Sequence, residues 1–168
     1  MTGYVIAVWL HVVAAAVWVG SMVFFAAAIV PVVRSQEFRA VAPALVARVG
    51  ARFRVLGWIS LGILFATGLA NLHYRGVGFR ALADGTFWAT GFGRAFAWKL
   101  VLVAVVVVLT ALHDAVTAGR SGAALRQPPT SEDALRARRR ASYVGRAVLL
   151  ASLGILFFAV AMVRGFLG

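Results

Sequence analysis

Four ionisable side chains of this 168-residue chain lie within, or at the ends of, long apolar runs: His11, His73, Lys99 and His113. An ionisable group in the hydrocarbon of a membrane is costly, and it usually has a partner, a proton path or a metal. Histidine is also the commonest protein ligand for metals, haem iron included. These residues are therefore the first place to look for chemistry.

The apolar runs themselves predict an all-α, polytopic membrane protein with a four-transmembrane-helix bundle. Hydrophobic residues make up 62% of the chain, whereas a soluble domain has about 45–50%. A run of about 18 apolar residues can cross the hydrocarbon core as a helix. The expected spans are about 5–30, 54–74, 95–117 and 144–165. Because they occupy most of the sequence, we expect residues 1–168 to form a single transmembrane domain.

Two segments outside these spans also have helical features. In 34–54, apolar side chains recur at helical spacing, and we expect a short amphipathic helix that is interrupted near Pro43. A second helix start is predicted at 130–133, where acidic residues follow Thr130 and Ser131. That helix is expected to run through the arginines at 136–140 into the fourth span.

The net charge of +12 comes mainly from arginines in alternate loops. Segments 34–54 and 113–146 together hold twelve arginines, and the other connections and the C-terminal tail hold four. Cytoplasmic loops carry the Lys/Arg excess. We therefore expect both termini and the 73–94 loop to lie outside, in the periplasm of a bacterium, and the protein to be a multi-pass inner-membrane protein. The lipid bilayer, and not nucleic acid, explains the charge.

The sulfur-containing residues restrict the metal chemistry. The absence of cysteine excludes disulfides, thiolate metal sites and iron–sulfur clusters. The three methionines, Met1, Met22 and Met162, form no cluster in the sequence, which disfavours a methionine-lined path for a soft metal.

The predicted topology sorts the ionisable residues by depth. His11 and Lys99 are each expected roughly 10 Å outward of the membrane midplane, and His73 roughly 13 Å outward. His113 is expected roughly 10 Å inward, so it does not share a site with His11. The alternatives are structural: a neutral His11 bonded to a neighbouring helix, an interfacial His73, a snorkelling Lys99 and a His113 favoured by the helix dipole.

His11 and His73 on adjacent helices are suited to clamp one haem iron axially, with the macrocycle in the core of the bundle. Lys99 would then pair with a haem propionate or with an anionic substrate. The same two histidines also suit copper, although two ligands make an incomplete site.

Several motifs resemble the CopD-like (copper resistance protein D) membrane family. They are residues 9–20 (WLHVVAAAVWVG), 53–58 (FRVLGW) leading into 67–71 (TGLAN), 98–100 (WKL) and 111–114 (ALHD). A more distant likeness is to HemJ-type protoporphyrinogen oxidases, which also have an early histidine in helix one and a lysine that opens helix three. Their proline and acid signature in the last helix is missing here.

The resemblance implies a role in copper uptake or resistance, or binding of haem b as in relatives of the wider group. It carries over His11 and Lys99 as family positions, and His113 with Asp114 for a subset. Three functions stay open: a haem b protein for electron transfer or a redox step, a copper transport or resistance protein, and a non-catalytic accessory subunit. Partners beyond the bilayer would be a larger membrane complex or further copies of the chain.

Overall fold

The computed structural model describes residues 1–118 and 132–164, and the regular structure of these residues is helical throughout. Four of the helices are long and apolar enough to cross a membrane: Thr2–Arg34, Ala42–Tyr74, Gly91–Ala115 and Leu135–Arg164. The predicted all-α class and the four apolar helices are thus confirmed.

The first span is one helical rod of three parts. It begins with α1 (Thr2–Phe24), widens into the π-helical turn η1 (Phe25–Ile29), and ends with α2 (Val30–Arg34). Pro31 lies in the first turn of α2. A proline inside a helix lacks an N–H donor and clashes with the preceding turn, and the wider π turn lies where that clash would fall. The span therefore continues through Pro31 to Arg34, a few residues beyond the predicted end at about residue 30.

The second span is longer than predicted because it absorbs the amphipathic segment. Helix α3 runs without interruption from Ala42 to Tyr74, and Pro43 stands in its first turn. The predicted break at Pro43 is wrong, since proline fits the first turn of a helix, where its missing N–H would have no partner anyway. A helix of 33 residues is about 50 Å long, so α3 extends beyond a hydrocarbon core of about 30 Å.

Two short helices, α4 (Phe79–Ala83) and α5 (Gly85–Ala89), connect the second and third spans. The Asp84 carboxylate accepts a 3.0 Å hydrogen bond from the backbone N–H of Thr86 and so caps α5. This bond stabilises the charged form and lowers the pKa of Asp84. Gly93 passes so close to the backbone of Phe87 that a Cβ there would clash. The connection is thereby held against the start of the third span.

The third and fourth spans are α6 (Gly91–Ala118) and α8 (Glu132–Arg164). As predicted, α8 begins within the acidic segment and runs through the arginines into the apolar span without a break. Thr130 and Ser131, the first residues of the predicted helix start, lie outside the described residues.

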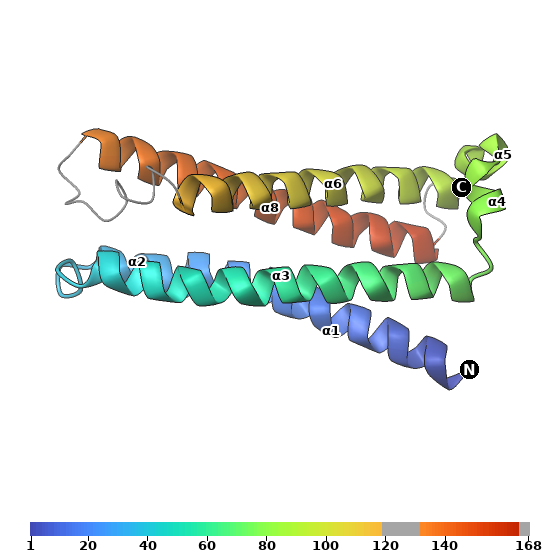
Figure 1. Cartoon of the computed structure of the whole chain (residues 1–168), viewed down its shortest axis with the longest axis horizontal. Coiled ribbons are helices and arrows are strands. Elements are labelled where there is room, and N and C mark those ends of the chain that lie inside the picture. The colour runs from blue at the N-terminus through green and yellow to red at the C-terminus, as the bar shows by residue number, and fades with distance from the viewer. Residues whose placement is uncertain (119–131, 165–168) are drawn as a thin grey trace.

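The long helices form two hairpins. Helix α1 packs along α3, and α6 packs along α8, with the main backbone contact between the hairpins made by α1 and α8. Figure 1 shows that the start of α1, the end of α3, the short helices and the Arg164 end of α8 lie at one end of the bundle. The α2–α3 turn lies at the other end (Figure 1), so each of the four spans runs along the length of the bundle.

The hairpins meet in a small core around Trp18, Val106 and Val148, which are buried. Gly57 makes room for the indole, because a Cβ at this position would lie 2.8 Å from Cζ3 of Trp18. Most other large apolar side chains face outward, as in a bundle whose surroundings are lipid.

Candidate functional site

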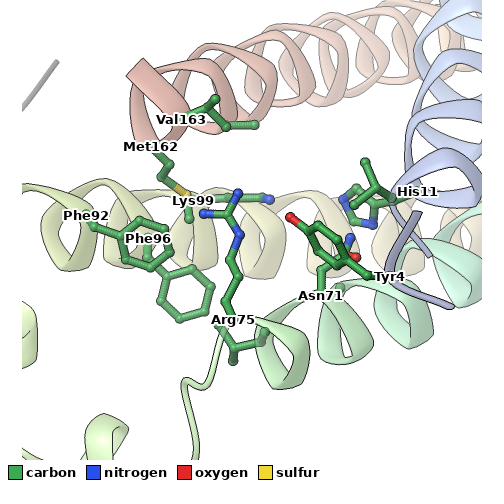
Figure 2. Close-up of a pocket in the computed structure, with 13 residues that line it drawn as sticks. Tyr4, His11, Asn71, Arg75, Phe92, Phe96, Lys99, Met162 and Val163 are labelled. Carbon is green, nitrogen blue, oxygen red and sulfur yellow. The ribbon is translucent and has the colours of Figure 1, made fainter. Parts of the chain in front are cut away.

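A cavity of about 180 Å³ lies between the two hairpins, and residues near the start of α1, the end of α3, the start of α6 and the end of α8 line it. All four long helices contribute to its wall. Its polar and sulfur-containing lining residues are Tyr4, His11, Asn71, Arg75, Lys99 and Met162. Figure 2 shows these side chains converging from different helices on one space. The cavity is therefore the part of the described bundle that gathers the groups able to do chemistry.

His11 is held in a defined position on the wall of the cavity. Its imidazole is half-buried, and the ring Nδ1 lies 2.8 Å from Oγ1 of Thr67 on α3. Thr67 is buried, and its hydroxyl donates a 2.6 Å hydrogen bond to the carbonyl oxygen of Ile63. The ring is thus tied to the adjacent helix and does not point to lipid.

Two cationic side chains face the same cavity from opposite hairpins. Lys99 enters from α6, and Arg75 enters from the end of α3, with its guanidinium directed toward the lysine (Figure 2). The Arg75 guanidinium carbon also lies 5.7 Å from the centre of the Phe92 ring. No aspartate or glutamate is among the residues that line the cavity. A pair of cations with no carboxylate beside them favours an anionic ligand.

Asn71 adds a polar group without a partner. Its Oδ1 atom is buried and accepts no hydrogen bond from the part of the chain that the structure describes. Buried polar atoms are nearly always paired, so an unpaired one needs a reason. Because the side chain lines the cavity, a bound molecule is a natural partner for the amide, whichever of its two polar atoms faces inward.

His73 does not belong to this cavity. Its side chain is exposed, and its ring makes an edge contact with neighbouring Tyr74 at 5.9 Å. At about 100° per residue, His73 lies about 200° around α3 from both Asn71 and Arg75. Those two residues face the cavity, so His73 is on the opposite face of the helix. The structure brings His11 together with Lys99 and not with His73.

His113 and Asp114 lie near the other end of α6, far along the bundle from the cavity. Asp114 accepts a 2.7 Å hydrogen bond from Nε1 of Trp58 on α3. His113 is half-buried and is not among the cavity residues. The contact of Asp114 joins α3 to α6, so the geometry gives this carboxylate a structural part.

Sequence reasoning did not assign Thr67, Asn71, Arg75 or Met162 to the site, although residues 67–71 belong to one of the motifs that carry the family resemblance. Asn71 and Arg75 are four residues apart and so lie on one face of α3, a spacing that would have grouped them. Met162 comes from α8, which is distant in the sequence. Nothing in the residues around Met162 indicates that its side chain lines the cavity.

The cavity is poorly suited to hold a bare metal ion. Within residues 1–118 and 132–164, no group of three or more histidine, cysteine or acidic residues could hold one. Lys99 and Arg75 would also repel a cation in a site of low dielectric. This geometry gives less support to a copper site than to an anion site.

Comparisons with known proteins identify one relative. No protein-family model matches the chain, and no solved structure matches it. An uncharacterized protein of Aquifex aeolicus (strain VF5) is 34% identical over an alignment of 112 residues, and the match covers 62% of this chain and 64% of the relative. The chain thus matches somewhat less than two thirds of the relative's length.

Proposed function

We propose that this protein holds haem b between its two hairpins for electron transfer or a redox step. In this proposal His11 would ligate the haem iron, and Lys99 and Arg75 would pair with the propionates. The observation that carries the proposal is the combination in one cavity of an anchored imidazole and two cations without a carboxylate. Haem b presents a metal that takes imidazole and two carboxylates that take cations.

The chemical types of the lining residues suit haem b. Imidazole is the commonest haem ligand, and the aromatic rings of Phe92 and Phe96 offer apolar contact to a macrocycle. The sequence hypothesis took His73 as the second ligand, but that residue faces away. Met162 lines the cavity with His11, and a thioether is a known second haem ligand that raises the reduction potential.

The size of the cavity requires movement on binding. Its volume of about 180 Å³ is below the range of about 300–1,000 Å³ that is typical of ligand pockets. The cavity lies between the hairpins, and few backbone contacts cross between them. We therefore expect the hairpins to separate at this end when the ligand enters, while the core around Trp18 stays closed.

Haem, when bound, supplies a one-electron couple. The role of the protein would be to bind the haem and to orient it. Thr67 holds the imidazole, and the cations compensate negative charge that would otherwise be costly in the membrane. Apolar side chains such as Phe92 and Phe96 line the cavity beside the cations, and a lower dielectric would strengthen the interaction between the cations and the carboxylates.

The distribution of arginines indicates which face of the membrane the cavity lies near. The cavity is lined by residues near the end of α3 and the end of α8. Arg48, Arg52 and Arg140 belong to the first parts of these two helices, which lie toward the other end of the bundle (Figure 1). Because arginine-rich segments favour the cytoplasm, we place the cavity near the periplasmic face of a bacterial inner membrane, with both termini outside. Reporter fusions at each end would test this, and a cytoplasmic 73–94 loop would contradict it.

A visible spectrum tests the haem proposal directly. Protein purified in mild detergent from haem-replete cells should show a Soret band that shifts on reduction with dithionite. The pyridine haemochrome assay should give about one haem b per chain. A colourless, folded protein that also fails to take up added haem would contradict the proposal.

A further inference from the structure

The hydroxyl of Thr67 contacts both His11 and the backbone of its own helix. Thr67 is one of the buried hydroxyl residues of α3, and its Oγ1 has two close partners on different helices. One is the carbonyl oxygen of Ile63, one turn earlier in α3, at 2.6 Å, and the other is Nδ1 of His11 in α1, at 2.8 Å. The hydroxyl therefore links the imidazole to the backbone of the neighbouring helix.

The single hydrogen of this hydroxyl determines the direction of both bonds. A carbonyl oxygen has no hydrogen, so the contact of Thr67 with Ile63 needs the hydroxyl hydrogen. The hydroxyl then has only lone pairs left for His11, and Nδ1 must be the donor. The opposite arrangement would leave two oxygen lone pairs facing each other at 2.6 Å inside an apolar bundle.

We infer that Thr67 is a positioning residue that holds neutral His11 in the Nδ1–H tautomer and leaves the lone pair of Nε2 available to a ligand in the cavity. A neutral imidazole has one protonated and one free nitrogen, and the bond of the first decides which nitrogen is free. Ligating histidines are commonly fixed in this way by an acceptor on their other nitrogen.

Gly68 lies beside the edge of the imidazole that holds Cε1. The ring atom Cε1 lies between the two nitrogens, and a Cβ placed on Gly68 would be 3.6 Å from it. Gly68 has no side chain that could cover this edge of the ring, and both residues line the cavity. Thr67 thus anchors one nitrogen, and glycine leaves the neighbouring edge open.

The tautomer can be measured on haem-free protein, so this inference is tested separately from the proposed function on which its biological meaning rests. The chain has three histidines, and His73→Gln with His113→Gln leaves His11 as the single imidazole. In this variant, labelled with ¹⁵N-histidine and studied in lipid at mildly alkaline pH, NMR should show a protonated Nδ1 and an unprotonated Nε2. A proton on Nε2 would overturn the inference.

Two substitutions of Thr67 distinguish positioning from simple packing. Thr67→Val has a similar shape without the hydroxyl, and it should shift the tautomer toward Nε2–H or a mixture. Thr67→Ser restores the hydroxyl and should restore the Nδ1–H signal. Retention of a pure Nδ1–H tautomer in a folded Thr67→Val protein would contradict the inference. If Thr67→Val does not fold, the measurement on the threonine-containing chain still decides.

A second readout applies to haem-loaded protein. Loss of an outer hydrogen bond to a ligating histidine typically weakens metal affinity by about 10- to 100-fold. We expect a loss of this size in haem affinity for Thr67→Val, and recovery for Thr67→Ser. Equal affinities for all three proteins, with haem bound through His11, would show that Thr67 has no positioning role.

Discussion

Nε1 of Trp18 in α1 donates a 3.0 Å hydrogen bond to Oγ of Ser152 in α8, and both side chains are buried. The serine hydroxyl in turn donates to the carbonyl of Val148. This polar contact joins the two hairpins inside their apolar core. It lies in the core that we expect to stay closed when the cavity opens.

Ser152→Ala should therefore destabilise the association of the hairpins. The indole N–H would lose its acceptor in a buried place, at a cost of about 1–3 kcal/mol, and at the lower end of that range if the unfolded state in the membrane finds other partners. Thermal unfolding in detergent, followed by tryptophan fluorescence, measures the effect. Ser35→Ala is the control, because Ser35 is exposed and its hydroxyl donates to the carbonyl of Val32, three residues earlier in the chain. Equal stability of the two variants would contradict the prediction.

Gly57→Ala should disturb the same core by steric overlap. An added Cβ would meet the Trp18 ring at 2.8 Å, and overpacking of a core typically costs about 1–3 kcal/mol. Gly62→Ala is a matched control on the same helix, since a Cβ at Gly62 has no atom within 4 Å. Alanine is the better helix former, so we expect Gly62→Ala to be neutral or stabilising. A melting temperature lowered equally by both substitutions would argue against the packing described.

Asp114 should be important for the helix contact and not for the cavity. Asp114→Ala removes the acceptor of the Trp58 indole, and we expect faster hydrogen exchange in the nearby turns of α3 and α6. Asp114→Asn keeps an acceptor oxygen and should restore most of the protection. Haem affinity should change by less than about twofold in both variants, because separate sites rarely couple strongly. A large loss of haem affinity in either variant would contradict this prediction and would show that Asp114 contributes to ligand binding.

Lys99 and Arg75 should recognise the carboxylates of haem b. The dimethyl ester of haem b lacks these negative charges, so comparing the affinities of the two molecules tests this recognition. The wild-type chain should bind haem b about 10-fold or more tightly than the ester, as expected for one or two charge-assisted hydrogen bonds. Lys99→Met should bring the two affinities closer, and Arg75→Met should have a smaller effect, because this side chain is the more exposed. If the ester binds as well as haem b to the wild-type chain, the cations have another purpose.

The four helices could be predicted from the sequence because length and apolarity suffice for a membrane span. Their extents could not. Pro43 was predicted to interrupt a helix, yet it stands in the first turn of α3, and the first span continues past Pro31, which follows a π turn. Proline restricts the chain strongly, but whether it ends or begins a helix depends on its register with the neighbouring turns.

The candidate site was predicted in part, and the missing part is a matter of rotation. Depth changes by only 1.5 Å per residue, so a small error in the centre of a span hardly matters. Orientation changes by about 100° per residue, and these helices are apolar almost all round, so the sequence contains little information on their inner faces. His11 and Lys99 therefore meet in the cavity as grouped, whereas His73 of similar expected depth faces away.

His11, and not His73, should be the residue that binds the ligand in the cavity. Equilibrium titration of haem b into detergent-purified His11→Gly and His73→Gly proteins tests it most directly. The account predicts that His11→Gly loses high-affinity binding and its Soret signature, that free imidazole restores the signature, and that His73→Gly binds like the wild-type chain. Loss of binding in His73→Gly with normal binding in His11→Gly would contradict the account.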